Sequence, residues 1–167
     1  MRPKIVDLIT NLIQQDKIKE PIVELCAGWD EQVKNILKSN GLKDYIRHDA
    51  YDWGNIDVIE DITKLSFESN KFNTVLLLEA LEHIAEPQKA IDEVFRIIKP
   101  SGFVVITTHM CWELHGREEY RDYWRFLPDG LKYLLKNFKD VEIVLEGSSN
   151  EPWGSIYAFA NKGKKKE

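Results

Sequence analysis

Hydrophobic positions along the chain alternate between two spacings. Residues 4–15 place apolar side chains three and four apart, which predicts an amphipathic opening helix. We expect further helices over 31–39, with Asp30 as the N-cap, and from Pro87, which suits a first helical turn. A fourth helix is expected near 128–138.

Short apolar runs typical of buried strands separate these helices. They lie at residues 22–26, 45–48, 58–59, 72–78, 103–108, 141–146 and 155–160. Repeated strand–helix–strand units predict an α/β fold, a three-layer doubly wound Rossmann-like sheet with helices on both faces. We expect seven strands with the last one antiparallel, because no helix-length segment separates the final two. The second and third strands are also too close in sequence for a helix between them.

Length and composition narrow the class of protein. The 167 residues are 43% hydrophobic and 31% charged, which indicates one globular domain. We expect this domain over 1–161 and a basic, disordered tail over 162–167. No run approaches the about 20 apolar residues of a membrane helix, and the first residues do not resemble a signal peptide, so we expect a cytoplasmic protein without a membrane partner. The net charge of -5 argues against a nucleic-acid partner.

Cysteines and histidines offer a possible metal site, which the spacing does not favour. His109, Cys111, Glu113 and His115 lie close together in sequence but match no standard zinc motif. Adding Cys26 would require the first and fifth strands to converge. A strand between them would hold them about 10 Å apart. We therefore expect no metal and no disulfide.

Candidate functional residues lie at the carboxyl ends of the predicted strands, where open parallel sheets bind their ligands. All four histidines fall at or just after such ends: His48, His83, His109 and His115. Only Gly28 stands in the turn after the first strand. A pyrophosphate-binding GxGxxG motif is therefore absent, as is a P-loop.

Acidic residues at the strand ends suit an adenosyl cofactor that carries no phosphates. Asp49, at the end of the second strand, could accept hydrogen bonds from both ribose hydroxyls. Asp61 could accept from the adenine amino group, with Ile62 against the ring. Three other acidic residues between positions 44 and 61 are interpreted as solvent-exposed loop residues: Asp44, Asp52 and Asp57.

The block FNTVLLLEALEHIAEPQKAIDEVFRIIKPSGFVVITT (72–108) resembles the class I S-adenosylmethionine-dependent methyltransferases, in particular their type 11 domain family. It is similar to the family's F-D-x-V, L-E-H and L-K-P-G-G motifs, with Asn73 in place of Asp and Ser101 in place of Gly. Residues 59–72 look like the family's D-x-x-x-L-P-F segment. The resemblance covers roughly residues 20–160 and implies S-adenosylmethionine as the cofactor.

The first motif of this family, D/E-x-G-x-G-x-G, is only partly present. Glu24 and Gly28 match it, whereas Cys26 and Asp30 occupy the flanking glycine positions. Asp30 would repel the carboxylate of the cofactor unless it turns away as a helix cap. The resemblance assigns Glu24, Cys26, Gly28 and Glu79 to cofactor binding.

The loops after the fourth and fifth strands face the transferred methyl group in this family. His109 and His115 are therefore candidate general bases, and Tyr123 is a candidate orienting hydroxyl. His83 is a candidate acceptor contact that could instead hydrogen-bond the backbone and hold its loop.

A stretch rich in aromatic and basic residues follows the fifth strand. Trp112, Trp124 and Arg125 are candidate acceptor contacts, and residues 122–126 (DYWRF) resemble one branch of the family. If this stretch is helical, three arginines share one face: Arg117, Arg121 and Arg125. Two interpretations stay open, a cationic aromatic lid over a planar or anionic acceptor and an amphipathic connector packed on the sheet.

The leading hypothesis is methyl transfer from S-adenosylmethionine to a small or flexible acceptor by in-line displacement. The alternative is a non-catalytic module that kept the fold and binds an adenosyl ligand or a protein. A small molecule is the expected partner.

Overall fold

The computed structural model describes residues 3–146 and 154–163. The helices are α1 (Pro3–Gln14), α2 (Gln32–Ser39), α3 (Pro87–Ile97) and α4 (Pro128–Leu134), with single 3-10 turns at η1 (Ile62–Lys64) and η2 (Leu81–His83). The strands are β1 (Ile22–Leu25), β2 (Tyr45–Asp49), β3 (Val58–Ile59), β4 (Phe72–Leu78), β5 (Ile98–His109), β6 (Lys139–Glu146) and β7 (Ser155–Asn161).

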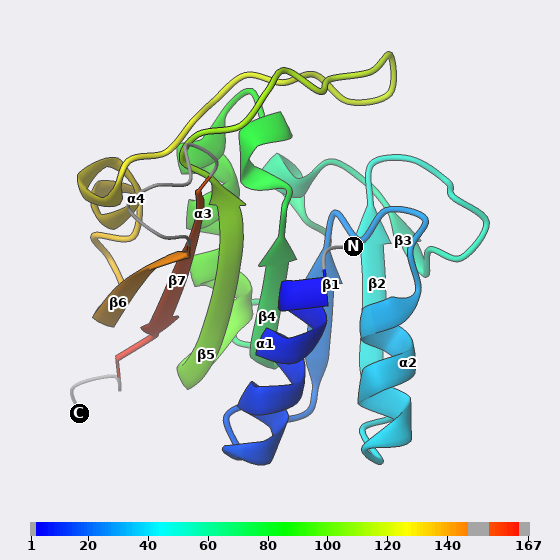
Figure 1. Cartoon of the computed structure of the whole chain (residues 1–167). Helices are drawn as coiled ribbons and strands as arrows, with labels where there is room; N and C mark the ends of the chain where they lie inside the picture. The colour runs from blue at the N-terminus through cyan, green and yellow to red at the C-terminus, as the bar shows by residue number, and fades with distance from the viewer. Residues whose placement is uncertain (1–2, 147–153, 164–167) are drawn as a thin grey trace.

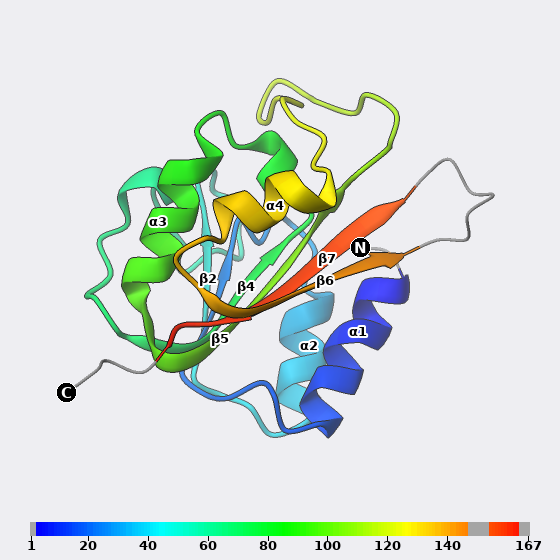
Figure 2. The same cartoon turned by 90° about the vertical axis from the view of Figure 1, so that its left-hand side faces the viewer.

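These strands form one seven-stranded sheet in the order β3-β2-β1-β4-β5-β7-β6. The strands from β3 to β5 pair in parallel, and β7 is antiparallel to both β5 and β6. Helices α1 and α2 cover one face and α3 and α4 the other (Figures 1 and 2). The predicted α/β fold is confirmed, including the reversed last strand and the connection from β2 to β3 without a helix.

The two faces of the sheet bury two separate cores. In β4, Val75 and Leu77 pack under α3 and α4, whereas Leu76 and Leu78 pack under α1 and α2. All four side chains are almost completely buried. The unbroken apolar run of β4 follows from this two-sided burial, since both faces of a strand between helical layers exclude water.

The ends of two helices differ from the predicted ones. Helix α2 begins at Gln32 with Glu31 at the cap position, while the Asp30 carboxylate accepts a hydrogen bond from the Gln32 amide (2.8 Å). Helix α4 ends at Leu134, earlier than expected. Lys162, assigned to the tail, donates to the backbone carbonyls of Phe95 and Ile98. The rest of the predicted tail, 164–167, lies outside the described residues.

The segment 110–127, which joins β5 to α4, contains no helix or strand. The condition for aligning three arginines on one helical face is therefore not met. Arg117 instead lies over the Trp29 ring, with its guanidinium carbon 5.8 Å from the ring centroid. Within the described ranges, no helix combines the length and apolar character that crossing a membrane requires.

Replacement of His48 by leucine is expected to raise the melting temperature by about 2–4 °C, which corresponds to about 1 kcal/mol for a domain of this size. His48 is fully buried in β2, and neither ring nitrogen has a well-formed hydrogen bond among the described residues. Burial lowers the pKa of His48, so the folded protein holds the neutral imidazole. Below the ordinary pKa of 6.5 the unfolded chain binds a proton first, and stability falls as the pH falls.

This acid-sensitive contribution should disappear in His48→Leu. Thermal unfolding of both proteins at pH 7.5 and pH 5.5 measures it. An equal loss of stability on acidification in the two proteins would contradict the assignment.

Candidate cofactor and acceptor site

A cavity of about 970 Å³ lies at the carboxyl ends of β1, β2, β4 and β5. Ligand pockets range from about 300 to 1,000 Å³, so this volume can hold a cofactor together with a small acceptor. Segment 110–127 passes over this end of the sheet (Figure 1). The cavity therefore forms where open α/β sheets bind ligands.

The loop after β1 fixes the position of Asp49 in the cavity wall. Gly28 has a positive φ of 61°, which favours glycine, and its amide donates to Asp49 Oδ2 (2.9 Å). The Tyr51 amide donates to Oδ1 (3.0 Å). Cys26 also has a positive φ, 55°, at the position where the family carries glycine. Both carboxylate oxygens of Asp49 are thus held by backbone donors before any ligand binds.

Arg47 supports this loop from inside the protein, and sequence analysis did not single it out. Its side chain is 1% exposed and donates to the carbonyl oxygens of Ala27 and Gly28 (3.1 Å each) and of Asp30 (2.5 Å). Its Nε lies 3.5 Å from Glu24 Oε2. The signal available in the sequence was an arginine inside a segment predicted to be a strand of the central sheet.

Glu24, assigned to cofactor binding, does not line the cavity. Its carboxylate accepts a hydrogen bond from the Tyr45 hydroxyl and pairs with Arg47. Burial raises the pKa of Glu24 to about 7, against the opposing effects of these two partners. Through its pair with Arg47, Glu24 is connected to the loop after β1.

The predicted adenine contacts lie together on another part of the wall. Asp61 Oδ1 accepts hydrogen bonds from the amide and hydroxyl of Thr63 (2.8 Å each), and the buried Ile62 side chain lines the cavity beside it. Trp29 and Trp53, whose ring centroids are 5.5 Å apart, also line the cavity. Asp49, Asp61 and Ile62 are therefore brought to one cavity, as predicted.

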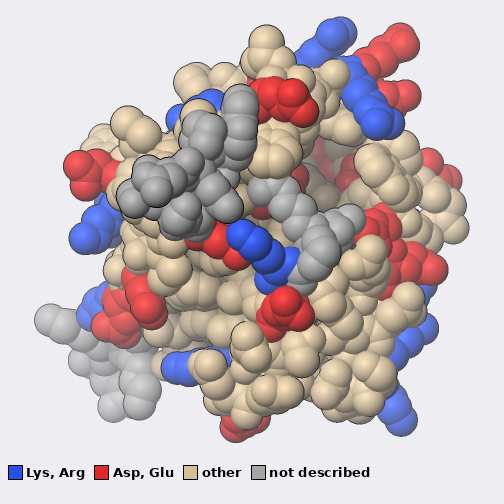
Figure 3. Space-filling model, viewed as in Figure 1, with Lys and Arg blue, Asp and Glu red and all other residues tan. Residues whose placement is uncertain are grey.

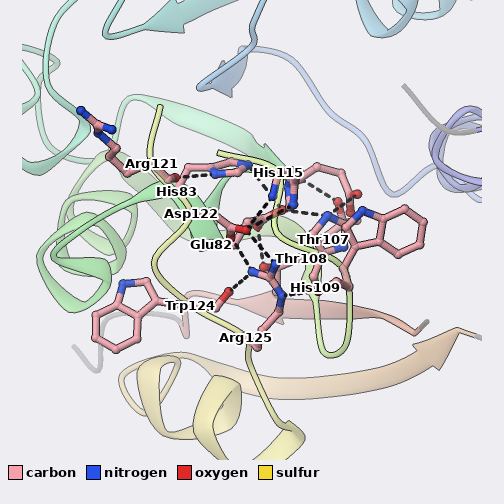
Figure 4. A network of polar contacts seen from close by, with 12 residues as sticks. Glu82, His83, Thr107, Thr108, His109, His115, Arg121, Asp122, Trp124 and Arg125 are labelled. Carbon is pink, nitrogen blue, oxygen red and sulfur yellow. Dashed lines mark hydrogen bonds and ion pairs between the residues drawn. The ribbon is translucent and has the colours of Figure 1, made fainter. Parts of the chain in front are cut away.

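A cluster of carboxylates and imidazoles lies where β4 and β5 end (Figure 4). His109 Nε2 is 3.2 Å from Glu82 Oε1 and 3.4 Å from Glu79 Oε2. The His109 ring centroid is 5.1 Å from that of His115 and stacks at 5.5 Å on Trp112. The predicted residues of this end thus converge, and Glu82, which sequence analysis left out, lies at their centre.

His83 connects this cluster to segment 110–127. Its Nδ1 lies 2.7 Å from the Arg121 carbonyl oxygen, and its ring contacts those of His115 and Tyr120. Burial lowers the pKa of His83, so the neutral ring donates its Nδ1 proton to the carbonyl. Its Nε2 lies 4.0 Å from Glu82 Oε1, and both His83 and the half-exposed Tyr123 line the cavity.

Two candidate acceptor contacts, Trp124 and Arg125, lie outside the cavity lining. Arg125 holds both carboxylate oxygens of Asp122 and the carbonyl oxygen of Trp112, and it keeps the pKa of Asp122 well below its usual range. Trp124 donates its indole N–H to the Ile84 carbonyl (2.9 Å). Neither Arg125 nor Trp124 lines the cavity, because both fasten the segment to the protein beside it.

The cavity is acidic. Among the described residues, eight carboxylate side chains line it, and Arg121 is the single lysine or arginine that does so. Acidic side chains surround the hollow on the face seen in Figure 3. Of the three arginines in segment 110–127, Arg121 lines the cavity, and Arg117 and Arg125 do not.

Both cysteines are free. Cys26 lines the cavity, where burial raises the pKa of its thiol, and Cys111 is exposed. Strand β4 lies between β1 and β5, which separates the two cysteines as expected.

The sheet order, the glycine turn after β1 and the carboxylate at the end of β2 define a Rossmann-like α/β protein. A family model described as a methyltransferase domain (Methyltransf_11) matches residues 22–106, and the chain belongs to this family.

Curated relatives include a demethylmenaquinone methyltransferase of Paenarthrobacter aurescens, 40% identical over 58% of this chain and 44% of the relative. Another is phosphoethanolamine N-methyltransferase 2 of Caenorhabditis elegans, 29% identical over 50% of this chain and 18% of the relative. The chain thus spans less than half the length of these relatives.

Solved structures share the fold at low sequence identity. The [4+2]-cyclase SpnF superposes with a TM-score of 0.74 at 13% identity, covering 96% of this chain and 81% of SpnF. A Burkholderia thailandensis 1,6-didemethyltoxoflavin-N1-methyltransferase with bound S-adenosylhomocysteine gives 0.72 at 14% identity, covering 95% and 78%. A cyclase and a methyltransferase on one fold mean that the fold alone does not determine the reaction.

Proposed function

We propose that the cavity binds S-adenosylmethionine and that the protein transfers its methyl group to a small acceptor. The observation that carries the proposal is the Asp49 carboxylate, which the Gly28 and Tyr51 amides hold in the cavity wall with lone pairs left for two ribose hydroxyls. Asp61 and Ile62 would take the adenine. The methionine part would then extend past Cys26 and Gly28 toward Glu79.

The reacting methyl group would face the cluster around His109. In an in-line displacement, a lone pair of the acceptor forms the bond to the methyl carbon while the carbon–sulfur bond breaks. The bonding electrons return to sulfur, and S-adenosylhomocysteine leaves. Catalysis comes mainly from holding the two reactants close and aligned. The histidine cluster is the site at which a hydroxyl or protonated amine would lose its proton.

The acidic wall favours a neutral or cationic acceptor. Of its eight carboxylates, those of Asp49, Asp61 and Glu79 are assigned to the cofactor, and those of Glu118 and Glu119 belong to segment 110–127. An anionic acceptor would meet repulsion there, since Arg121 is the one described guanidinium at the wall.

Titration calorimetry with S-adenosylmethionine and S-adenosylhomocysteine tests the proposed function. We expect one cofactor molecule per chain and a rise in melting temperature with either ligand. NAD serves as the control, because the loop after β1 lacks the glycines that a pyrophosphate requires. If neither adenosyl ligand gives binding heat or a thermal shift, the proposed methyltransferase activity is contradicted. The alternative, a non-catalytic module, then remains.

A further inference from the structure

Three potential metal ligands meet at the acceptor end of the cavity. Glu82 from η2, His109 from the end of β5 and His115 from segment 110–127 each place a ligand atom within 4.8 Å of the others. Two ligands of tetrahedral zinc lie about 3.3 Å apart when each bond is about 2.0–2.1 Å. The contact between Glu82 Oε1 and His109 Nε2, at 3.2 Å, already has this separation. Small side-chain rotations would close the remaining gaps.

One carboxylate oxygen of Glu82 accepts no hydrogen bond among the described residues. Glu82 is completely buried, and its Oε1 has no hydrogen-bond donor among the described residues. The neighbouring His109 nitrogen is within ion-pair distance but lacks hydrogen-bond geometry. A buried carboxylate oxygen without a donor is costly, and a coordinated cation would compensate that cost.

Surrounding groups orient the ligands as they do in known metal sites. The Thr108 hydroxyl donates to Glu82 Oε2 (2.6 Å), which turns Oε1 toward the histidines. His115 Nδ1 lies 3.0 Å from the Glu113 carbonyl oxygen and 3.4 Å from Asp122 Oδ2. A carbonyl can only accept a hydrogen bond, so Nδ1 carries the proton and Nε2 presents its lone pair.

We propose that Glu82, His109 and His115 bind a divalent transition-metal ion, with zinc as the best match, beside the position of the acceptor. Two imidazoles and one carboxylate form the ligand set of catalytic zinc sites that keep a fourth position open. All three residues line the cavity, so that position would take an oxygen atom of the acceptor. Glu82 is absent from the residues for which the sequence predicted no metal, because only the fold brings it to the histidines; those residues are Cys26, His109, Cys111, Glu113 and His115.

A second group, His83, His115 and Asp122, also brings ligand atoms within 4.8 Å of one another. It is less suited to an ion, because Arg125 already holds both oxygens of Asp122.

The metal would deepen the proposed function by activating the acceptor. Zinc would lower the pKa of a coordinated acceptor hydroxyl as it lowers that of bound water, and the proton would pass to water in the cavity. The oxygen lone pair could then form the bond to the methyl carbon while the carbon–sulfur bond breaks. His109 and His115 would then serve as ligands rather than as free bases. The acidic cavity wall would stabilise the added positive charge.

Calorimetric titration of the whole chain with zinc chloride tests the proposal without any activity measurement, and the absorption spectrum of the cobalt(II) complex reports the coordination. We expect one ion per chain. Glu82→Gln and His115→Asn should each weaken zinc binding by more than the about 10–100-fold that loss of an outer-shell partner costs. Cys111→Ser is the matched control, since this exposed thiol is near the cluster in sequence but outside it, and it should bind zinc as the original protein does.

Circular dichroism and thermal unfolding establish that each variant is folded. If Glu82→Gln does not fold, His115→Asn still tests the site, because His115 lies outside the helices and strands. No stoichiometric zinc binding, or unchanged affinity in His115→Asn, would overturn the metal site. Calorimetry with S-adenosylhomocysteine in the same samples separates the two proposals. Zinc binding without nucleoside binding would refute the cofactor assignment alone, and the reverse result would refute the metal alone.

Discussion

Arg47→Met is expected to lower the free energy of unfolding by about 3–5 kcal/mol, because it leaves a buried charge without its partner. Glu24 is 2% exposed and pairs with Arg47 in the core. The guanidinium also satisfies the carbonyl oxygens of Ala27, Gly28 and Asp30. Removing it should loosen the loop that positions Asp49, so affinity for S-adenosylhomocysteine should fall as well.

Urea unfolding monitored by circular dichroism measures the change in stability. The double variant Arg47→Met with Glu24→Leu is the control, since replacing both members of a buried pair by apolar residues removes the unpaired charge. It should recover part of the lost stability while cofactor affinity stays reduced, because the loop carbonyls still lack their donor. A single variant within about 1 kcal/mol of the original protein, the range of a surface ion pair, would show that Arg47 does not hold the loop.

Asp49→Ala is expected to weaken binding of S-adenosylmethionine by about 100-fold or more. Each hydrogen bond from a ribose hydroxyl to the carboxylate contributes about 1.5–3 kcal/mol, and each 1.4 kcal/mol corresponds to a factor of ten. The substitution also removes the acceptor of the Gly28 amide. Titration calorimetry measures the affinity.

Asp52→Ala is the matched control for Asp49→Ala. Asp52 lies three residues further along the same loop, where its carboxylate accepts from the Gly54 amide outside the cavity lining. Its replacement should leave cofactor affinity unchanged. Equal affinities of the two variants would remove Asp49 from the site.

The sequence predicted those features that depend on position along the chain. The apolar run that ends at Leu78 identified the central strand, since burial on both faces demands apolar residues throughout. Asp49 and Asp61 were predicted to lie near each other because each follows a strand of the parallel sheet, and both line the cavity. These inferences need only periodicity and topology.

Features that depend on tertiary partners could not be predicted in the same way. Arg47 appears in the sequence as one charge among many, and its four carbonyl partners come from loops that are distant in sequence. Glu82 was taken only as part of a family motif, because its contact with His109 arises where η2 meets β5. Arg125 was assigned to the acceptor, although Asp122, three residues earlier, binds its guanidinium.

The contact between Arg117 and Trp29 has a consequence for turnover. It joins segment 110–127 to the loop after β1, on opposite sides of the cavity. An exposed cation–π pair contributes about 0.5–1 kcal/mol, which changes an opening equilibrium by only a few-fold. Breaking this one contact would therefore cost little, while Trp124 and His83 still hold the segment through hydrogen bonds. If S-adenosylhomocysteine is the product, its residence time should depend on how often the contact between Arg117 and Trp29 breaks.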